Sequence, residues 1–139
     1  MYRGDKGCKK NIQHMIGFKE ELYKENILEH YKHPQNKGAL DPCDFTEKGV
    51  NPSCGDVLTL CVVVKDGKIE NISFDGEGCA ISIAGASMLT EFAKEKTVKK
   101  LQKMEESAMF DMLGVSISPG REKCALLAYG ALQKIVKSN

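Results

Sequence analysis

Two apolar segments on either side of Asp66-Gly67 constrain the fold of this chain more than any other feature. Residues 57–65 (VLTLCVVVK) and 68–74 (KIENISF) are rich in β-branched side chains, which favour extended strands. An Asp-Gly pair suits a tight turn because both positions tolerate positive φ. The sequence therefore predicts an antiparallel β-hairpin in which Cys61 lies on the face opposite to Leu60.

Helical periodicity and turn residues predict the remaining elements. Apolar residues recur at helical spacing in four segments, at residues 18–31, 80–96, 98–104 and 119–136. Gly85 lies inside the second of these segments and costs that helix about 1 kcal/mol relative to alanine. A further short strand is expected at residues 43–50.

The N-terminal residues differ in composition from the rest of the chain. They carry no sustained apolar period, so we expect a flexible tail at residues 1–17 and a single folded domain at residues 18–139. The formal net charge is +1, which gives no reason to expect a nucleic acid or a membrane surface as partner. Because the chain has no apolar run of ~20 residues and no secretory signal, we expect a cytoplasmic protein.

The six cysteines are expected to serve metal or redox chemistry, because a reducing cytoplasm disfavours disulfides. In NPSCGD, at residues 51–56, Gly55 permits a bend that can aim the Cys54 thiolate and the Asp56 carboxylate at one ion. Cys79 follows two glycines and precedes a predicted helix, where free backbone N–H groups favour a thiolate. Cys124 begins the last helix beside basic residues, so its thiolate should be favoured too.

Three sulfurs and one carboxylate can complete a tetrahedral site for zinc, copper(I) or iron–sulfur species. The harder Asp56 oxygen should make such a site more exchangeable than four sulfurs would. The alternative is that Cys79 and Cys124 are small core residues. Five further candidate ligands are interpreted as packing, incidental or solvent-facing residues, namely Cys61, Cys8, Cys43, His30 and His33.

Four segments, taken in order along the chain, resemble one known family. They are His30-Tyr31 with Pro34, Asn36 and Gly38, then NPSCGD at 51–56, GEGCAIS at 76–82 and REKCALLAYGAL at 121–132. The chain is similar, from about Leu22 to its C-terminus, to the IscU/SufU-type iron–sulfur cluster assembly scaffolds. These scaffolds also occur as the N-terminal domain of NifU.

The resemblance implies an α+β fold, a three-stranded antiparallel sheet with helices packed against it and the metal or cluster site at one tip. It implies that Cys54, Asp56, Cys79 and Cys124 hold the metal or cluster. A cysteine desulfurase would pass persulfide sulfur to the scaffold, with Cys54 as the acceptor, and iron would enter. A transient [2Fe–2S] cluster would then pass to apo iron–sulfur proteins, and zinc would occupy the site when no cluster is present.

Departures from the family pattern do not decide whether this chain belongs to the IscU or the SufU branch. Lys123 stands where IscU proteins have a histidine, and SISPGREK replaces their LPPVK segment, so we do not expect a dedicated IscU-type chaperone. The insertion typical of SufU proteins between the second and third cysteines is missing. The rival hypothesis is a SufU-like zinc-dependent sulfurtransferase that relays sulfur to another scaffold, and a structural zinc module is a third.

Overall fold

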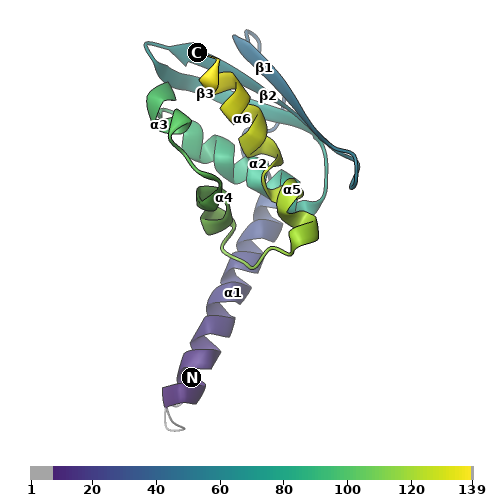
Figure 1. The fold of residues 1–139 in the computed structure, drawn as a ribbon, viewed down its shortest axis with the longest axis vertical. Coiled ribbons are helices and arrows are strands. Elements are labelled where there is room, and N and C mark those ends of the chain that lie inside the picture. The colour runs from purple at the N-terminus through teal and green to yellow at the C-terminus, as the bar shows by residue number, and fades with distance from the viewer. Residues whose placement is uncertain (1–7, 139) are drawn as a thin grey trace.

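The computed structural model describes residues 8–138, and the side chains of residues 20–138. Figure 1 shows the fold, in which helices gather on one side of a sheet while one long helix extends from it. The elements are α1 (Cys8–Lys32), β1 (Phe45–Asn51), β2 (Asp56–Lys65), β3 (Lys68–Glu77), α2 (Ala80–Ala93), α3 (Val98–Gln102), α4 (Glu106–Leu113), η1 (Pro119–Arg121), α5 (Glu122–Ala125) and α6 (Leu127–Lys137).

The three strands form one antiparallel sheet in the order β1-β2-β3, which confirms the α+β class. The expected hairpin is present, with Lys65 opposite Lys68 across the turn. Asp66 has φ 54° and Gly67 has φ 77°, the positive values that a two-residue hairpin turn requires. The third strand, β1, falls where the sequence predicts a short strand and pairs with β2 from Phe45 onward.

The core lies between one face of the sheet and the helices α2 and α6. Leu58, Leu60 and Val62 alternate along β2 and are completely buried, while the residues between them are only partly buried. Leu89 of α2 and Leu132 of α6 pack into the same cluster. Each such leucine stabilises the fold by about 1.5–3 kcal/mol. This packing fixes the ends of β2, α2 and the last helices relative to one another.

Helix α1 begins earlier than the sequence predicts. It starts at Cys8, so residues 8–17 are helical where we expected part of a flexible tail. Residues 1–7 lie outside the described residues, and the tail stays a prediction there. Near its C-terminal end α1 is fixed to α2, since His30 Nδ1 lies 2.7 Å from the Ser87 hydroxyl oxygen.

The C-terminal third contains two departures from the expected helices. Residues 105–117, where the sequence predicts no helix, contain α4, whose C-cap residue Gly114 has φ 70°. The single last helix that the sequence predicts is divided at Leu126, so α5 carries Cys124 and α6 carries buried apolar residues such as Leu132 and Ile135. The division lies where β1 packs closely, because a Cβ at Gly49 would approach Leu127 to 3.2 Å.

One pair of cysteines contradicts the expectation that the chain forms no disulfide. Cys43, just before β1, forms a disulfide with Cys61 on β2. The sequence had indicated that Cys61 is a packing residue and that Cys43 is incidental. Their Cα atoms are 5.8 Å apart, within the range that a disulfide spans. The pairing depends on the register of β1 against β2, which places Thr46 opposite Cys61 and so brings the preceding loop to this strand.

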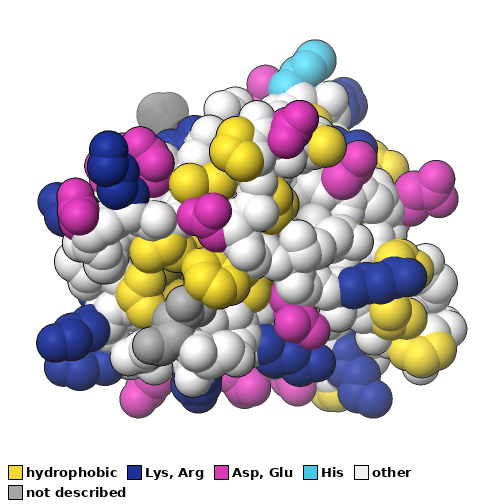
Figure 2. Space-filling model, turned by 90° about the horizontal axis from the view of Figure 1, so that it is seen from above, with side chains coloured by type: hydrophobic (Ala, Val, Ile, Leu, Met, Phe, Trp, Pro, Cys, Tyr) yellow, Lys and Arg dark blue, Asp and Glu magenta, His cyan; other side chains and the backbone are white. Residues whose placement is uncertain are grey.

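The surface carries charges of both signs. Lys, Arg, Asp and Glu side chains are interspersed on the face that Figure 2 shows. Among residues 8–138 no helix has the length and apolar character that a bilayer crossing needs.

Candidate metal centre

The turn between β1 and β2 presents Cys54 to solvent. The backbone N–H groups of Cys54 and Gly55 both donate to the carbonyl oxygen of Asn51, at 3.2 and 2.9 Å. Gly55 has φ 75°, a value that L side chains rarely adopt, and this permits the tight turn. Asp56 is the first residue of β2 and is 1% exposed. The turn therefore holds an exposed thiol two residues from a buried carboxylate.

Asp56 also binds the start of α2. The backbone N–H of Cys79, the residue before that helix, donates to Asp56 Oδ1 at 3.1 Å, and the Cys79 sulfur lies 3.8 Å from Oδ2. A carboxylate is stabilised there by the partial positive charge of the helix N-terminus. Gly78 permits the approach, since a Cβ at this position would contact the Ser82 hydroxyl and lie 3.3 Å from the Asp56 carboxylate.

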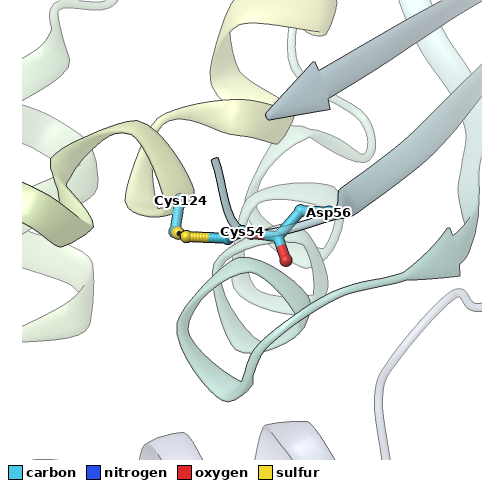
Figure 3. Close-up of side chains that lie close together, drawn as sticks. All are labelled: Cys54, Asp56 and Cys124. Atoms are coloured by element: carbon cyan, nitrogen blue, oxygen red, sulfur yellow. Dashed lines mark hydrogen bonds between the residues drawn. The ribbon is translucent and has the colours of Figure 1, made fainter. Parts of the chain in front are cut away.

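Cys124 completes the cluster from α5. Its sulfur lies 3.5 Å from the Cys54 sulfur, and Figure 3 shows the two sulfurs facing each other with the Asp56 carboxylate beside them. One ligand atom each from Cys54, Asp56 and Cys124 lie within 4.8 Å of one another. The structure thus brings together all four residues that the sequence singled out, Cys79 through its contact with Asp56.

The protonation of Cys124 differs from our expectation. Its side chain is 1% exposed, and this burial, followed by hydrogen bonds with Asp56, Cys54 and Cys79, raises the pKa of the Cys124 thiol far above its ordinary value. Arg121 and Lys123 are exposed, so they do not offset this desolvation. The prediction that its neighbours favour the Cys124 thiolate is therefore wrong for the metal-free protein.

The donor set suits a thiophilic metal. Three thiols and one carboxylate from three separate segments can supply four ligands, and soft thiolates select zinc or iron–sulfur species over magnesium or calcium. Two of these donors, Asp56 and Cys124, are already buried in contact with their neighbours. The chemistry of the donors therefore fits zinc or an iron–sulfur cluster, and the role of each residue as a ligand stays a prediction.

Asn51 belongs to this site, although the sequence assigned it no role there. It is 3% exposed, and its Nδ2 donates to the Cys124 sulfur at 3.4 Å. Its Oδ1 is buried without a hydrogen-bond partner among the described residues. Its place at the head of NPSCGD was a signal, since a buried amide beside a cysteine can donate to sulfur. Its partner, 73 residues away, could not be read from that motif.

A groove of about 440 Å³ lies beside the Cys54 turn, between β1 and the last two helices. Val50, Leu126 and Leu127 contribute apolar lining, and Val50 is 51% exposed. The groove also includes three lysines, Lys48, Lys123 and Lys134. A partner segment that reaches Cys54 from this side would meet an apolar surface with positive charges around it.

Neither histidine considered as a ligand lies in the cluster. His30 pairs with Ser87, and His33 is exposed at the end of α1. Cys43 and Cys61 are bonded to each other, and the Cys8 side chain lies outside the described side chains. The cysteines with described side chains thus separate into one cluster and one disulfide.

The known proteins that this chain resembles belong to one family. The model of the NifU-like N terminal domain matches residues 22–138. The iron–sulfur cluster assembly scaffold protein IscU 1 of Archaeoglobus fulgidus is 36% identical over 115 residues, covering 83% of this chain and 74% of that protein. The zinc-dependent sulfurtransferase SufU of Bacillus subtilis is 36% identical over 132 residues, covering 83% of this chain and 89% of that protein.

The fold agrees with a solved structure of the same kind. A candidate iron–sulfur cluster assembly scaffold of the SUF system from Fervidobacterium islandicum AW-1 superposes with a TM-score of 0.72 at 29% identity. The superposition covers 83% of this chain and 96% of that one. The similarity therefore extends over nearly the whole of a related protein.

Proposed function

Because this chain belongs to the NifU-like N-terminal domain family of iron–sulfur cluster assembly scaffolds, we propose that it accepts persulfide sulfur, binds iron and assembles a [2Fe–2S] cluster for transfer to apo-proteins. The observation that carries the proposal is the convergence of three sulfurs and one carboxylate at one end of the sheet. A cysteine desulfurase is the sulfur donor in this proposal, and the cytoplasm is its setting.

Sulfur enters at Cys54. Its thiol is exposed on a turn, whereas Cys124 is buried and Cys79 is partly buried, so Cys54 is the thiol that a partner protein can reach. The Cys54 thiolate attacks the terminal sulfur of the desulfurase persulfide. A new S–S bond forms at Cys54, and the desulfurase cysteine leaves as a thiolate.

The remaining residues hold the cargo. Cys79, Cys124 and Asp56 receive ferrous iron as a substrate next to the sulfur on Cys54. Each persulfide sulfur takes up two electrons, from ferrous iron and from an external thiol reductant, to become a sulfide of the cluster. Cys124 must lose its proton before its sulfur can bind iron, because burial keeps it as a thiol in the metal-free protein. Asp56 supplies the hard ligand, whose weaker bond to iron favours release of the finished cluster.

The alternative is a zinc-dependent sulfurtransferase that relays sulfur from the desulfurase to a separate scaffold. The similarity to the SufU protein and the lysine before Cys124 favour it. Zinc bound by the four side chains would act as a Lewis acid that keeps the thiols deprotonated. Cys54 would remain the sulfur acceptor, since its exposure does not depend on the cargo.

The docking surface includes the groove beside Cys54. Its apolar lining and its lysines suit a partner loop that carries apolar and acidic side chains. Leu28 and Tyr31 of α1 are 49% and 43% exposed, and we include this helix in the partner surface.

Anaerobic reconstitution distinguishes the two functions. The protein is incubated with a cysteine desulfurase, cysteine, a dithiol reductant and ferrous iron, and visible absorbance is followed before and after addition of an apo-ferredoxin. A cluster chromophore that moves to the acceptor supports the scaffold. Retained zinc with no chromophore, together with faster desulfurase turnover, supports the sulfurtransferase. Cys54→Ser should abolish sulfur acceptance, and Ser53→Ala in the same turn serves as the matched control.

Asp56→Ala tests the role of the carboxylate. Loss of the oxygen ligand should slow cluster release to the acceptor by about tenfold, because the remaining soft ligands hold iron more firmly. The rate of cluster transfer measures this effect, with Asp75→Ala on β3 as a carboxylate control outside the site. Unchanged transfer by Asp56→Ala would remove the argument that this ligand makes the cluster labile.

A further inference from the structure

A second pair of sulfurs lies away from the metal centre. Cys43 and Cys61 are joined on the outer face of the sheet, opposite to the face that Leu60 and Val62 bury in the core. Cys61 is five residues along β2 from Asp56, a separation of about 17 Å at 3.3–3.4 Å per residue. The disulfide therefore cannot share an ion with the Cys54 cluster.

This disulfide borders a pocket of about 210 Å³ that is open to solvent. Its lining is mostly apolar, with Ala39 and Leu40 on the loop side, and three hydroxyl-bearing side chains, Thr46, Thr59 and Ser73, also contribute to it. Ser73 lies directly opposite Cys61 on β3, where paired side chains on one face approach to about 5 Å. Its hydroxyl is buried, at 4% exposed for the residue, and has no hydrogen-bond partner among the described residues. A thiolate formed at Cys61 would give this hydroxyl an acceptor.

Hydrogen bonds, independent of the disulfide, hold the loop that carries Cys43 against the sheet. The Asp44 N–H donates to the Val62 carbonyl at 3.0 Å, and the Asp44 carboxylate accepts from the Val64 N–H at 2.9 Å. Gly38 earlier in the same loop bonds to the Phe74 carbonyl at 2.8 Å. Cleavage of the S–S bond therefore leaves the two sulfurs adjacent, and they can bond again.

We propose that Cys43 and Cys61 form a separate exchange site for low-molecular-weight thiols, independent of the metal centre. A thiolate RS⁻ enters the pocket and forms a bond to the Cys43 sulfur, on the loop side. The Cys43–Cys61 bond breaks, and Cys61 leaves as a thiolate that accepts a hydrogen bond from Ser73 and then a proton from water.

The second half of the reaction completes a two-electron reduction. A second thiol, as thiolate, attacks the external sulfur of the mixed disulfide at Cys43, so RSSR is released and Cys43 leaves as a thiolate that takes up a proton. The net change is one protein disulfide plus two RSH to one protein dithiol plus RSSR. In a compartment rich in small thiols the pair is open, and it closes as RSSR accumulates.

Thiol counting on the full chain, loaded with zinc, tests the proposal. Samples are equilibrated with 2-mercaptoethanol and its disulfide at graded ratios, quenched with acid, alkylated and digested. Peptide mass spectrometry should show Cys43 and Cys61 gaining and losing their label together, while the circular dichroism spectrum keeps its folded shape. No bridged peptide under oxidising ratios, or reduction only with loss of the folded spectrum, would overturn it.

A matched pair of variants tests the part played by the serine. Ser73→Ala should slow reduction by 2-mercaptoethanol by about fivefold, the effect of one lost hydrogen bond to the leaving thiolate. Thr59→Ala, on β2 in the same pocket, should reduce at the parent rate. Equal rates for Ser73→Ala and the parent would show that Ser73 does not assist the reaction.

Cys43→Ser tests the independence of the two sites. This variant should abolish the disulfide and leave zinc affinity unchanged, whereas a parallel loss of zinc affinity would contradict that independence.

Discussion

Single side chains decide the chemistry of the metal centre more than its overall shape does. Asn51 is the clearest case. Its backbone carbonyl oxygen accepts the hydrogen bonds that hold the Cys54 turn, while its side-chain amide nitrogen donates to the Cys124 sulfur. One residue thereby links two segments that are distant in the chain. A hydrogen bond to sulfur stabilises the thiolate that a metal requires.

Asn51→Ala should weaken zinc binding by about tenfold to a hundredfold, the usual effect of losing a partner of a metal ligand. Competition with a chromophoric chelator measures the affinity. Gln133→Ala is the control, since it removes another buried amide, which donates to the Leu101 carbonyl far from the sulfurs. Equal losses of zinc affinity in both variants would indicate a general effect of destabilisation.

The raised pKa of Cys124 makes the stability of the metal-free protein depend on pH. The folded state keeps the proton at a pH where the unfolded chain has lost it, so the free energy of unfolding falls as pH rises. The contribution is complete below the ordinary thiol pKa and is lost progressively above it. Urea unfolding in chelator at pH 7.5 and at pH 10 should therefore show a larger decrease for the parent than for Cys124→Ser. Equal decreases would contradict the assignment.

At the scale of elements, short segments carry the site. Cys54 lies on a turn that ends at Gly55, Cys79 lies at the start of α2, and Cys124 lies on the four-residue α5. None of these positions is in the middle of a long helix or strand. The long elements instead supply the core that fixes the spacing between the three short segments.

Gly85 lies inside α2, and its replacement tests whether the stability of this helix can be increased without disturbing the metal centre. A Cβ there would lie 3.5 Å from the Ala125 carbonyl and 3.6 Å from the Met109 methyl group, which are ordinary contacts. Gly85→Ala should therefore raise the free energy of unfolding by about 1 kcal/mol, the gain in helix propensity. Denaturant titration measures it. A loss of stability would mean that the neighbouring α5 cannot accept the methyl group.

At the scale of the whole molecule, α1 differs from the other helices. Ile27 is buried, but Leu22 and Leu28 are about half exposed, so this helix buries only part of the apolar surface that its periodicity suggested. The contacts that fix it include His30 to Ser87 and the packing of Tyr23 against Gly114. The described part of the chain therefore combines a compact body with a helix whose exposed apolar side chains are available to a partner.

Removal of residues 1–17 should leave the domain folded, because the family match begins at residue 22 and the contacts just described begin at Tyr23. The midpoint of thermal unfolding should fall by less than about 4 °C, which corresponds to less than roughly 1 kcal/mol in a domain of this size. Differential scanning fluorimetry of residues 18–139 and of the full chain provides the measurement. A larger decrease would place residues 1–17 within the folding unit.

The sequence alone determined the hairpin, the main helices and the identity of the four clustered residues. Local chemistry sufficed for these, because Asp-Gly turns, helical periodicity and cysteines beside glycines depend on neighbours in the chain. Residues 105–117 and the division at Leu126 escaped prediction, because tertiary packing decides short helices. The family resemblance, more than any periodicity, supplied the three-stranded sheet.

Which groups meet, and how they are solvated, depends on the packing of segments that are distant in the chain. The protonated state of Cys124 follows from burial under other elements, and the partner of Asn51 lies on α5. The bond between Cys43 and Cys61 follows from the register of β1 on β2. Solvation and strand register arise from contacts between distant segments, and for that physical reason no local pattern in the chain could specify them.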